Sequence, residues 1–289
     1  MKKFKYSLFG LLSLGILVAS CSKDENLDTP TEQNVNNTKE VPQELVNIVA
    51  DLNMNSEMVR YDTFHFPDGT TEERIFIEDD IVITEAQLRD MLADKNGEKG
   101  DNLQGRQYST NNLVSQGRNI SVIGYTGGSQ ALSSAEQTAL QWAVNNYNRL
   151  NISIRFTLTF GTNYQNKNMV VYNNTVNNPS GAGGSAGFPS NGLPNKFVQI
   201  YGLSNYNTNV IEHVITHEMG HSVGFRHTDY FSRQSCGQNS NEGTAGVGAN
   251  PITGTPTGYD PTSIMLACFS NNEDGEFNNN DITALRALY

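Results

Sequence analysis

The sequence contains little charge, few cysteines and, after its first twenty residues, no long hydrophobic run. Charged residues make up 17% of the chain, acidic residues outnumber basic ones by 30 to 19, and the formal net charge is −11. No dense basic patch interrupts this acidic balance, which argues against a nucleic-acid partner. No later apolar stretch is long enough to cross a bilayer. We therefore expect neither a nucleic-acid-binding protein nor a transmembrane body.

The first twenty residues, MKKFKYSLFGLLSLGILVAS, have the basic start, apolar run and small residues of a secretory signal peptide. Residues 17–21 (LVASC) resemble a bacterial lipobox, in which Cys21 is acylated and becomes the mature N-terminus. The alternative is an ordinary signal peptide followed by an incidental cysteine. Residues 23–25 (KDE) resemble the tag of surface lipoproteins. We predict an exported protein whose only membrane attachment is a lipid in the outer membrane, facing either the periplasm or the cell surface.

Only three cysteines occur in the chain, and one of them is the expected lipid site, Cys21. The other two, Cys236 and Cys268, would lie in an oxidising compartment, where pairing is the usual state. A free, buried thiol is the alternative. We predict a disulfide between these two residues.

Composition divides the chain into four parts. Residues 1–20 are the predicted signal peptide, and residues 21–40 are polar enough to form a flexible tether. Residues 41–106 regain helix and strand patterns and end in a polar, glycine-bearing linker with a trypsin-like cleavage point at Arg106, which suggests a propeptide-like segment. Residues 107–289 are long enough to bury a core of their own and form the predicted catalytic domain.

The catalytic domain is predicted to have an α+β fold. Residues 119–125 alternate as a strand, and Ser133 and Glu136 form a capping box that opens a helix. Residues 152–160 alternate apolar and polar side chains, as in a half-buried strand. The remaining expected elements are strands at 169–173 and 197–201, a helix opened by a capping-box pair of Asn209 and Glu212, and a terminal helix in 281–289.

Three of the five histidines lie within eleven residues, HEMGHSVGFRH. His217 and His221 are four residues apart, so on a helix both imidazoles face one side and can bind one ion. Glu218 lies beside them, close enough to reach a metal-bound water. Gly224 is expected to end the helix, because glycine accepts a positive φ, and the following turn returns His227 to the same metal.

Three nitrogen ligands and an open fourth position are typical of catalytic zinc. We therefore expect one zinc ion as cofactor and Glu218 as general base. This residue would take a proton from the metal-bound water as that water attacks a carbonyl, and then deliver it to the leaving amine. The acidic stretch 270–281 lacks the spacing of a calcium loop, so no calcium site is predicted.

The pattern HExxHxxGxxH matches the signature of the metzincin zinc peptidases. Residues 263–265 (SIM) resemble the Met-turn of that clan, with Met265 as the hydrophobic floor beneath the zinc. Within the clan, HEMGHSVGFRHTD, with GSAGFP upstream and GTPTGYDPTSIMLAC downstream, most resembles the bacterial dual-action HEIGH metallopeptidases. The likeness covers about 185–289 by motif and 118–184 by the order of elements.

This resemblance implies a zinc endopeptidase acting on peptides or proteins, expected here as a monomer. It also implies a metzincin-like domain with a mixed twisted sheet, a backing helix, an active-site helix and an irregular C-terminal subdomain that carries the Met-turn and a terminal helix. The chain departs from astacin-like and serralysin-like enzymes at Ala267, where they carry a zinc-proximal tyrosine. No such ligand is expected.

Several residues outside the motif are weaker candidates for the site. Ala186, Gly187 and Phe188 are candidates for an edge strand that pairs with extended substrate, or they belong to a glycine-rich loop. His213, one turn before the first ligand, is expected on the helix surface or behind the ligands; the alternative is that it faces the site. Asp229 either orients a group of the site or makes a local turn contact.

Latency is the last expectation, because an exported peptidase with an open zinc site threatens its own secretion route. The stretch IEDDI, 77–81, loosely resembles the F-x-G-D motif by which astacin-like propeptides place an aspartate on zinc. Asp80, or its neighbour Asp79, is the candidate ligand. The alternative is a strand with solvated carboxylates.

Two other functions compete with the peptidase. One is a non-catalytic, surface-binding lipoprotein that retains a metzincin fold, and the other is hydrolysis of a different amide or ester. Glu218 argues against the first, because a binding protein has no use for a general base beside its metal.

Overall fold

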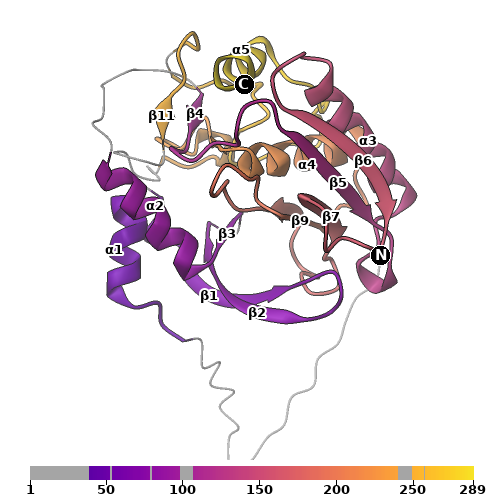
Figure 1. Ribbon diagram of the computed structural model, residues 1–289, viewed down its shortest axis with the longest axis horizontal. Helices are drawn as coiled ribbons and strands as arrows, with labels where there is room; N and C mark the ends of the chain where they lie inside the picture. Colours follow the sequence, from indigo (N-terminus) through magenta and orange to yellow (C-terminus); the bar gives the residue numbers. More distant parts are fainter. Residues whose placement is uncertain (1–38, 53, 79, 98–106, 240–248, 257) are drawn as a thin grey trace, which may run out of the picture. The chain divides into compact units, whose positions relative to one another are not determined.

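The computed structural model describes 39–52, 54–78, 80–97, 107–239, 249–256 and 258–289, with side chains omitted at 94–97 (Figure 1). The predicted signal peptide, Cys21, Asp79 and Arg106 lie outside these residues. Among the helices that are described, none combines the length and the apolar character needed to cross a membrane.

The N-terminal segment, residues 39–97, builds a three-stranded antiparallel sheet that packs with two helices. Its buried core is aliphatic and includes Leu45, Ile75 and Leu88. Helix and strand patterns predicted for this region are therefore confirmed. The elements are α1 (Gln43–Asp51), β1 (Val59–His65), β2 (Thr71–Ile77), β3 (Ile81–Ile83) and α2 (Glu85–Gly97).

The described part of residues 107–289 is organised around a five-stranded mixed sheet of order β6-β5-β7-β9-β8 (Figure 1). Strands β6, β5, β7 and β9 run parallel, and β8 pairs antiparallel with β9 at the edge. This arrangement confirms the predicted α+β class with a mixed sheet. The strands are β5 (Asn119–Tyr125), β6 (Arg155–Gly161), β7 (Met169–Asn173), β8 (Gly183–Ser185) and β9 (Phe197–Tyr201).

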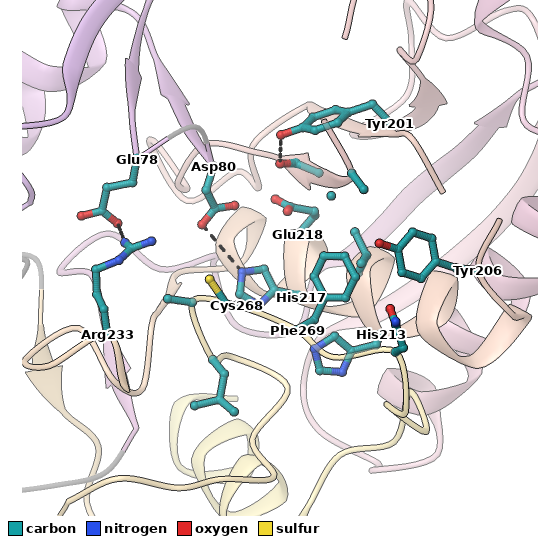
Figure 2. A pocket seen from close by; sticks show the side chains of 17 residues that line it. Glu78, Asp80, Tyr201, Tyr206, His213, His217, Glu218, Arg233, Cys268 and Phe269 are labelled. Carbon is teal, nitrogen blue, oxygen red and sulfur yellow. Dashed lines mark hydrogen bonds and ion pairs between the residues drawn. The ribbon is translucent and has the colours of Figure 1, made fainter. Parts of the chain in front are cut away.

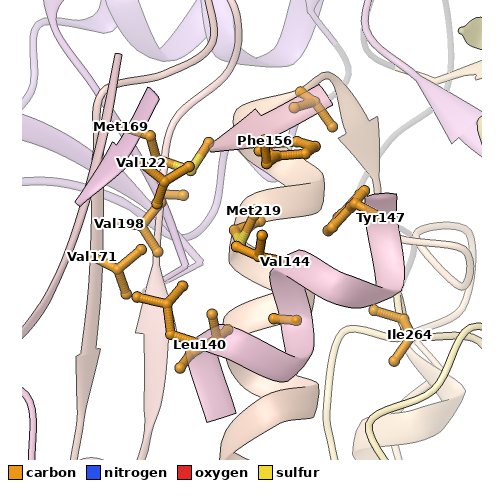
Figure 3. Close-up of a cluster of buried hydrophobic side chains, with 14 of the residues drawn as sticks. Val122, Leu140, Val144, Tyr147, Phe156, Met169, Val171, Val198, Met219 and Ile264 are labelled. Atoms are coloured by element: carbon orange, nitrogen blue, oxygen red, sulfur yellow. The ribbon is translucent and has the colours of Figure 1, made fainter. Parts of the chain in front are cut away.

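Two helices, α3 (Ser134–Asn148) and α4 (Thr208–Ser222), pack against each other and contribute to the main core (Figure 3). Strand side chains alternate, so Val122 joins this core while Ile123 joins a second cluster. That second cluster also takes in Phe64 of β1, so the N-terminal segment and the sheet share buried surface.

The capping predictions had different outcomes. Ser133 and Glu136 form the predicted capping box at the start of α3. The predicted pair at the start of α4 is wrong, because the helix begins two residues earlier than this pair implies and Asn207 is the N-cap, accepting from the backbone of Val210. Glu212 instead turns inward, where its carboxylate accepts a hydrogen bond from Asn146 at 2.8 Å. The buried hydrogen bond with Asn146 therefore takes the place of the capping contact that the local sequence pattern predicted for Glu212.

Strand β6 is less buried than its alternation predicts. Phe156 is buried, but Phe160 is 41% exposed. Strand β6 lies at the edge of the sheet, and its residues after Phe156 are exposed or only partly buried. The prediction of a half-buried strand holds only for its first residues.

The C-terminal part is mostly irregular and ends in α5 (Asn279–Leu288), as expected. Asp281 on this helix accepts hydrogen bonds from Gln107 and Ser263, so it connects the start of the domain to the turn before Met265. The remaining short elements are β4 (Tyr108–Ser109), β10 (Phe225–Arg226) and β11 (Asn250–Pro251), which form a small sheet, and the 3-10 turns η1 (Gly128–Gln130) and η2 (Gln234–Cys236).

Candidate metal centre

Helix α4 carries the first two candidate ligands, and the turn after it carries the third. The helix ends at Ser222, and Gly224 has φ +108, as expected for a glycine at a helix end. A Cβ at this position would lie 2.7 Å from a side-chain carbon of Leu113. The chain then forms β10, which pairs with β4 and leads to His227.

The three imidazoles converge and are buried, with His217, His221 and His227 respectively 7%, 0% and 1% exposed. The Nε2 atoms of His221 and His227 lie 3.3 Å apart. Tetrahedral nitrogen ligands at about 2.0–2.1 Å from zinc stand roughly 3.3 Å from one another, so this separation fits a shared ion.

Backbone carbonyls orient two of the three rings. Nδ1 of His217 is 2.8 Å from the carbonyl oxygen of Ile264, and Nδ1 of His221 is 2.8 Å from that of Phe225. A carbonyl only accepts, so each Nδ1 carries the proton and each Nε2 keeps a lone pair for a metal. This donor set suits zinc.

Glu218 is buried beside the ligands and packs against the edge strand β8. A Cβ on Gly184 would lie 2.6 Å from Cγ of Glu218, so this approach depends on a glycine. Within the described part of the protein, Oε2 of Glu218 has no hydrogen-bond partner. Burial, and then the neighbouring Asp80 carboxylate, raise the pKa of Glu218 well above its ordinary value. This group can accept and hold a proton.

The predicted Met-turn lies against helix α4, beside the histidine motif. Met265 is 3% exposed, and a Cβ added to Gly220 would meet its sulfur at 2.5 Å. The backbone of Thr228 donates to the carbonyl of Met265 at 2.8 Å, which connects the third-histidine loop to this turn. Met265 therefore packs on the α4 turn that holds His221.

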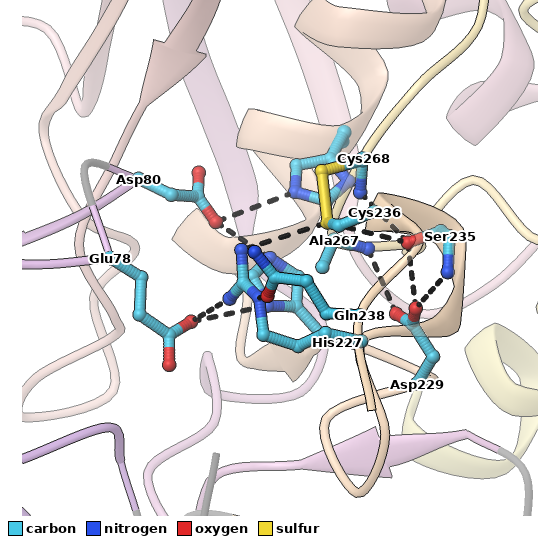
Figure 4. Close-up of a disulfide and its surroundings, with 11 residues drawn as sticks. Glu78, Asp80, His227, Asp229, Ser235, Cys236, Gln238, Ala267 and Cys268 are labelled. Carbon is cyan, nitrogen blue, oxygen red and sulfur yellow. Dashed lines mark hydrogen bonds and ion pairs between the residues drawn. A yellow bond between two sulfur atoms is a disulfide. The ribbon is translucent and has the colours of Figure 1, made fainter. Parts of the chain in front are cut away.

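The predicted disulfide between Cys236 and Cys268 is present, with Cα atoms 5.1 Å apart (Figure 4). Asp229 lies next to it and bridges two chain segments. Its carboxylate accepts from the backbone of Ala267 at 2.9 Å and from Ser235 at 2.9 Å and 2.6 Å. Asp229 thus makes turn contacts that connect the loop after His227 to the segment after Met265.

Asp80 from the N-terminal segment faces the three histidines. Its Oδ2 is 2.6 Å from Nε2 of His227, 3.1 Å from that of His221 and 3.7 Å from that of His217. The four side chains form one group of potential metal ligands. Burial raises the pKa of Asp80, but the imidazoles outweigh this effect and hold the pKa well below its ordinary value.

The expected substrate-binding residues divide into two sets. Ala186 lies at the edge of the sheet, where its N–H donates to the carbonyl of Asp80 at 2.9 Å and its own carbonyl accepts from Val82 at 2.7 Å. The close contact with this strand requires glycine at position 187, because a Cβ added there would lie 2.6 Å from the Val82 carbonyl oxygen. Phe188 is not at the edge and instead packs edge-on against His221 and within the core of the N-terminal segment.

A cavity of about 410 Å³ opens beside the histidines (Figure 2). Its lining includes Glu78 and Arg233, whose place the sequence did not predict, and His213. His213 is 4% exposed, and burial lowers its pKa to about 3. It is therefore neutral and part of the cavity wall. The expected helix-surface position is wrong, and the alternative, that one helical turn before His217 places His213 toward the site, is the one observed.

The family model for the dual-action HEIGH metallo-peptidases matches residues 75–289. Two solved structures, "Structure of Myroilysin" and "Crystal structure of myroilysin", are similar to the chain at 13% sequence identity, with TM-scores of 0.40 and 0.41. The first similarity covers 61% of this chain and 82% of that one, and the second covers 62% and 86%. None of the curated proteins compared with the chain matches it.

Proposed function

Because the chain belongs to the dual-action HEIGH metallopeptidase family, we propose that it is a zinc-dependent endopeptidase in which His217, His221 and His227 hold the metal and Glu218 is the general base. The observation that carries the proposal is the convergence of three buried imidazoles, two with their tautomers fixed by carbonyls, beside a buried carboxylate. A bound zinc ion supplies a Lewis acid that polarises a carbonyl and lowers the pKa of water.

Glu218 contributes the proton transfer. Its Oε2 has no partner among the described residues, and its pKa is raised by burial. A carboxylate of raised pKa takes a proton from the attacking water and returns it to the leaving amine more readily than an ordinary glutamate. The edge at Ala186 supplies backbone N–H and C=O groups that bind an extended peptide as an additional strand.

Asp80 keeps the full chain latent in this proposal. Its carboxylate lies within 2.6–3.7 Å of the three Nε2 atoms, and the adjoining backbone pairs with the edge expected to bind substrate. Both features support inhibition by a segment that fills the site. Cleavage in the linker before residue 107 is the proposed activation step. Acylation of Cys21, attachment to the outer membrane facing either the periplasm or the cell surface, and a monomeric state belong to the same proposal.

The alternative of a non-catalytic binding protein predicts that Glu218 is dispensable. The deciding experiment compares wild type, Glu218→Gln and the matched control Glu276→Gln, which alters an exposed glutamate paired with Arg149. Each is assayed on a fluorogenic peptide after limited trypsin treatment, and its zinc is measured by metal analysis.

We expect about one zinc per chain in all three proteins and a loss of at least about 10²-fold in kcat for Glu218→Gln alone. The peptidase proposal fails if the wild type holds no zinc or if Glu218→Gln is as active as the control.

A further inference from the structure

Glu78 and Arg233 form a buried ion pair in the cavity that contains the proposed active site. Oε2 of Glu78 is 2.9 Å from Nη1 of Arg233, and the two side chains are 1% and 9% exposed. Both line the same cavity as His217 and Glu218. Figure 2 shows the pair on one side of His217 and His213 on the other. The proposed peptide hydrolysis does not by itself require this pair.

The segment that carries Glu78 lies where an extended substrate is expected. Ile81 bridges in parallel to Ala186, and the carbonyl of Asp80 accepts from the Ala186 N–H at 2.9 Å. Asp80 faces the histidines, and Glu78 lies near it in the turn between β2 and β3, where the Asp80 N–H donates to the Ile77 carbonyl at 3.4 Å. This turn brings both carboxylates to the same cavity, so a substrate side chain that enters the cavity beside the metal site has access to Arg233.

Arg233 belongs to the catalytic domain and is held there by contacts other than Glu78. Its Nε donates to Oε1 of Gln238 at 3.1 Å. The disulfide of Cys236, three residues further on, joins this loop to Cys268, which also lines the cavity. The guanidinium therefore keeps its place in the cavity wall when the N-terminal segment leaves.

The chemistry of this pair identifies what replaces Glu78. A guanidinium presents a fork of N–H donors that matches a carboxylate, and a buried charge is stable only when it is paired. Glu78 itself has φ +61, a conformation that is costly for a residue other than glycine. The surrounding contacts, with the ion pair among them, must offset this cost.

We infer that Arg233 is a specificity-determining residue that binds an acidic side chain of the substrate close to the scissile bond, and that Glu78 occupies this subsite in the full chain. The inference rests on the proposed function and adds the class of substrate. A glutamate or aspartate in the peptide restores the pair with Arg233. A neutral side chain leaves the guanidinium without that carboxylate, and a basic one is repelled.

The first experiment measures cleavage preference. Fluorogenic peptides that differ only by Glu or Gln, scanned over three positions on each side of the scissile bond, are assayed with the trypsin-treated full chain. We expect kcat/KM to favour Glu by at least about tenfold at one position. This ratio should fall to about one in Arg233→Gln and be intermediate in Arg233→Lys, which keeps the charge without the fork of donors. It should be unchanged in the control Arg286→Gln, which alters an exposed arginine on α5. The inference is wrong if no position shows an acidic preference or if the preference survives in Arg233→Gln.

The second experiment needs no catalysis and separates the two proposals. A labelled peptide of residues 74–83 (RIFIEDDIVI) and the same peptide with Glu78→Gln are titrated onto the full chain that carries Glu218→Gln and has been freed of its N-terminal segment by trypsin, with and without Arg233→Gln. We expect the parent peptide to bind at least about tenfold tighter, and the difference to vanish with Arg233→Gln. Equal binding, or no binding of either peptide, overturns the inference. If binding discriminates but no peptide is ever cleaved, the peptidase proposal fails while the carboxylate subsite stands.

Discussion

Replacing Asp80 by alanine tests latency most directly, because this one carboxylate faces all three proposed ligands. Its Oδ2 lies 2.6 Å from Nε2 of His227 and 3.1 Å from that of His221, close enough to share one metal ion with these imidazoles. Removing one partner of a buried charged contact costs about 3–5 kcal/mol. Asp80→Ala removes this carboxylate, and we take the lower end, about 3 kcal/mol, as the loss.

A loss of about 3 kcal/mol raises the population of chains with an accessible site by roughly 10²-fold, since 1.4 kcal/mol corresponds to a factor of ten. The full-length Asp80→Ala protein should therefore cleave a fluorogenic peptide about 10²-fold faster than the full-length wild type. Trypsin treatment should then raise the activity of the variant by a much smaller factor than that of the wild type. The backbone contacts with Ala186 and the Glu78–Arg233 pair remain, so activation stays incomplete.

The assay compares four full-length proteins before and after limited trypsin digestion, with intact mass confirming which chains are uncut. They are wild type, Asp80→Ala, Asp79→Ala with Asp80→Ala, and the control Asp90→Ala, which alters an exposed residue of α2. If both Asp80 variants stay as inert as uncut wild type while the digested wild type is active, the carboxylate is not the inhibitor. Steric cover by the segment would then account for latency.

Three further predictions concern the structure around the site. Replacing Cys236 and Cys268 by serine opens a loop with a sequence separation of 32, and should lower the free energy of unfolding by about 3–4 kcal/mol in the chain-entropy model; equal urea midpoints for variant and wild type would contradict this. Gly184→Ala brings a Cβ within 2.6 Å of Cγ of Glu218, so it should displace the general base and lower kcat by at least about 10²-fold with zinc content unchanged; unaltered kcat would refute the contact. Burial raises the pKa of Asp281 from 3.8 to about 6, so between about pH 4 and pH 6 this carboxyl is protonated in the folded chain and ionised in the unfolded chain. The free energy of unfolding therefore falls as the pH rises through this range. In urea titrations at several pH values, Asp281→Asn should abolish up to about 3 kcal/mol of this pH-dependent loss of unfolding free energy. The same pH dependence in the variant and the wild type would exclude Asp281 as its source.

Local patterns in the sequence predicted the parts of the site that one helix and one turn build. His217 and His221 are brought together by helical spacing alone, and Gly224 ends that helix in the conformation that glycine favours. The capping box of α3 was equally local and is present. The start of α4 was mispredicted because Glu212 finds its partner in Asn146, which is 66 residues away in the chain. No pattern within one helix contains that contact.

Contacts between distant segments were decided only by the tertiary structure. The sequence offered Asp80, or its neighbour Asp79, as the candidate and a solvated strand as the alternative, and the pairing of Ile81 with Ala186 is what turns Asp80 toward the histidines. Phe188 was grouped with the substrate edge, yet it is buried against His221.

Arg233 and Glu78 are 155 residues apart, and each alone has the sequence environment of an ordinary surface charge. An ion pair, a strand pairing and a cavity wall depend on which segments meet. Helical spacing and glycine conformation depend on neighbours along the chain, which is why the sequence determined the histidine motif while the fold decided what faces it.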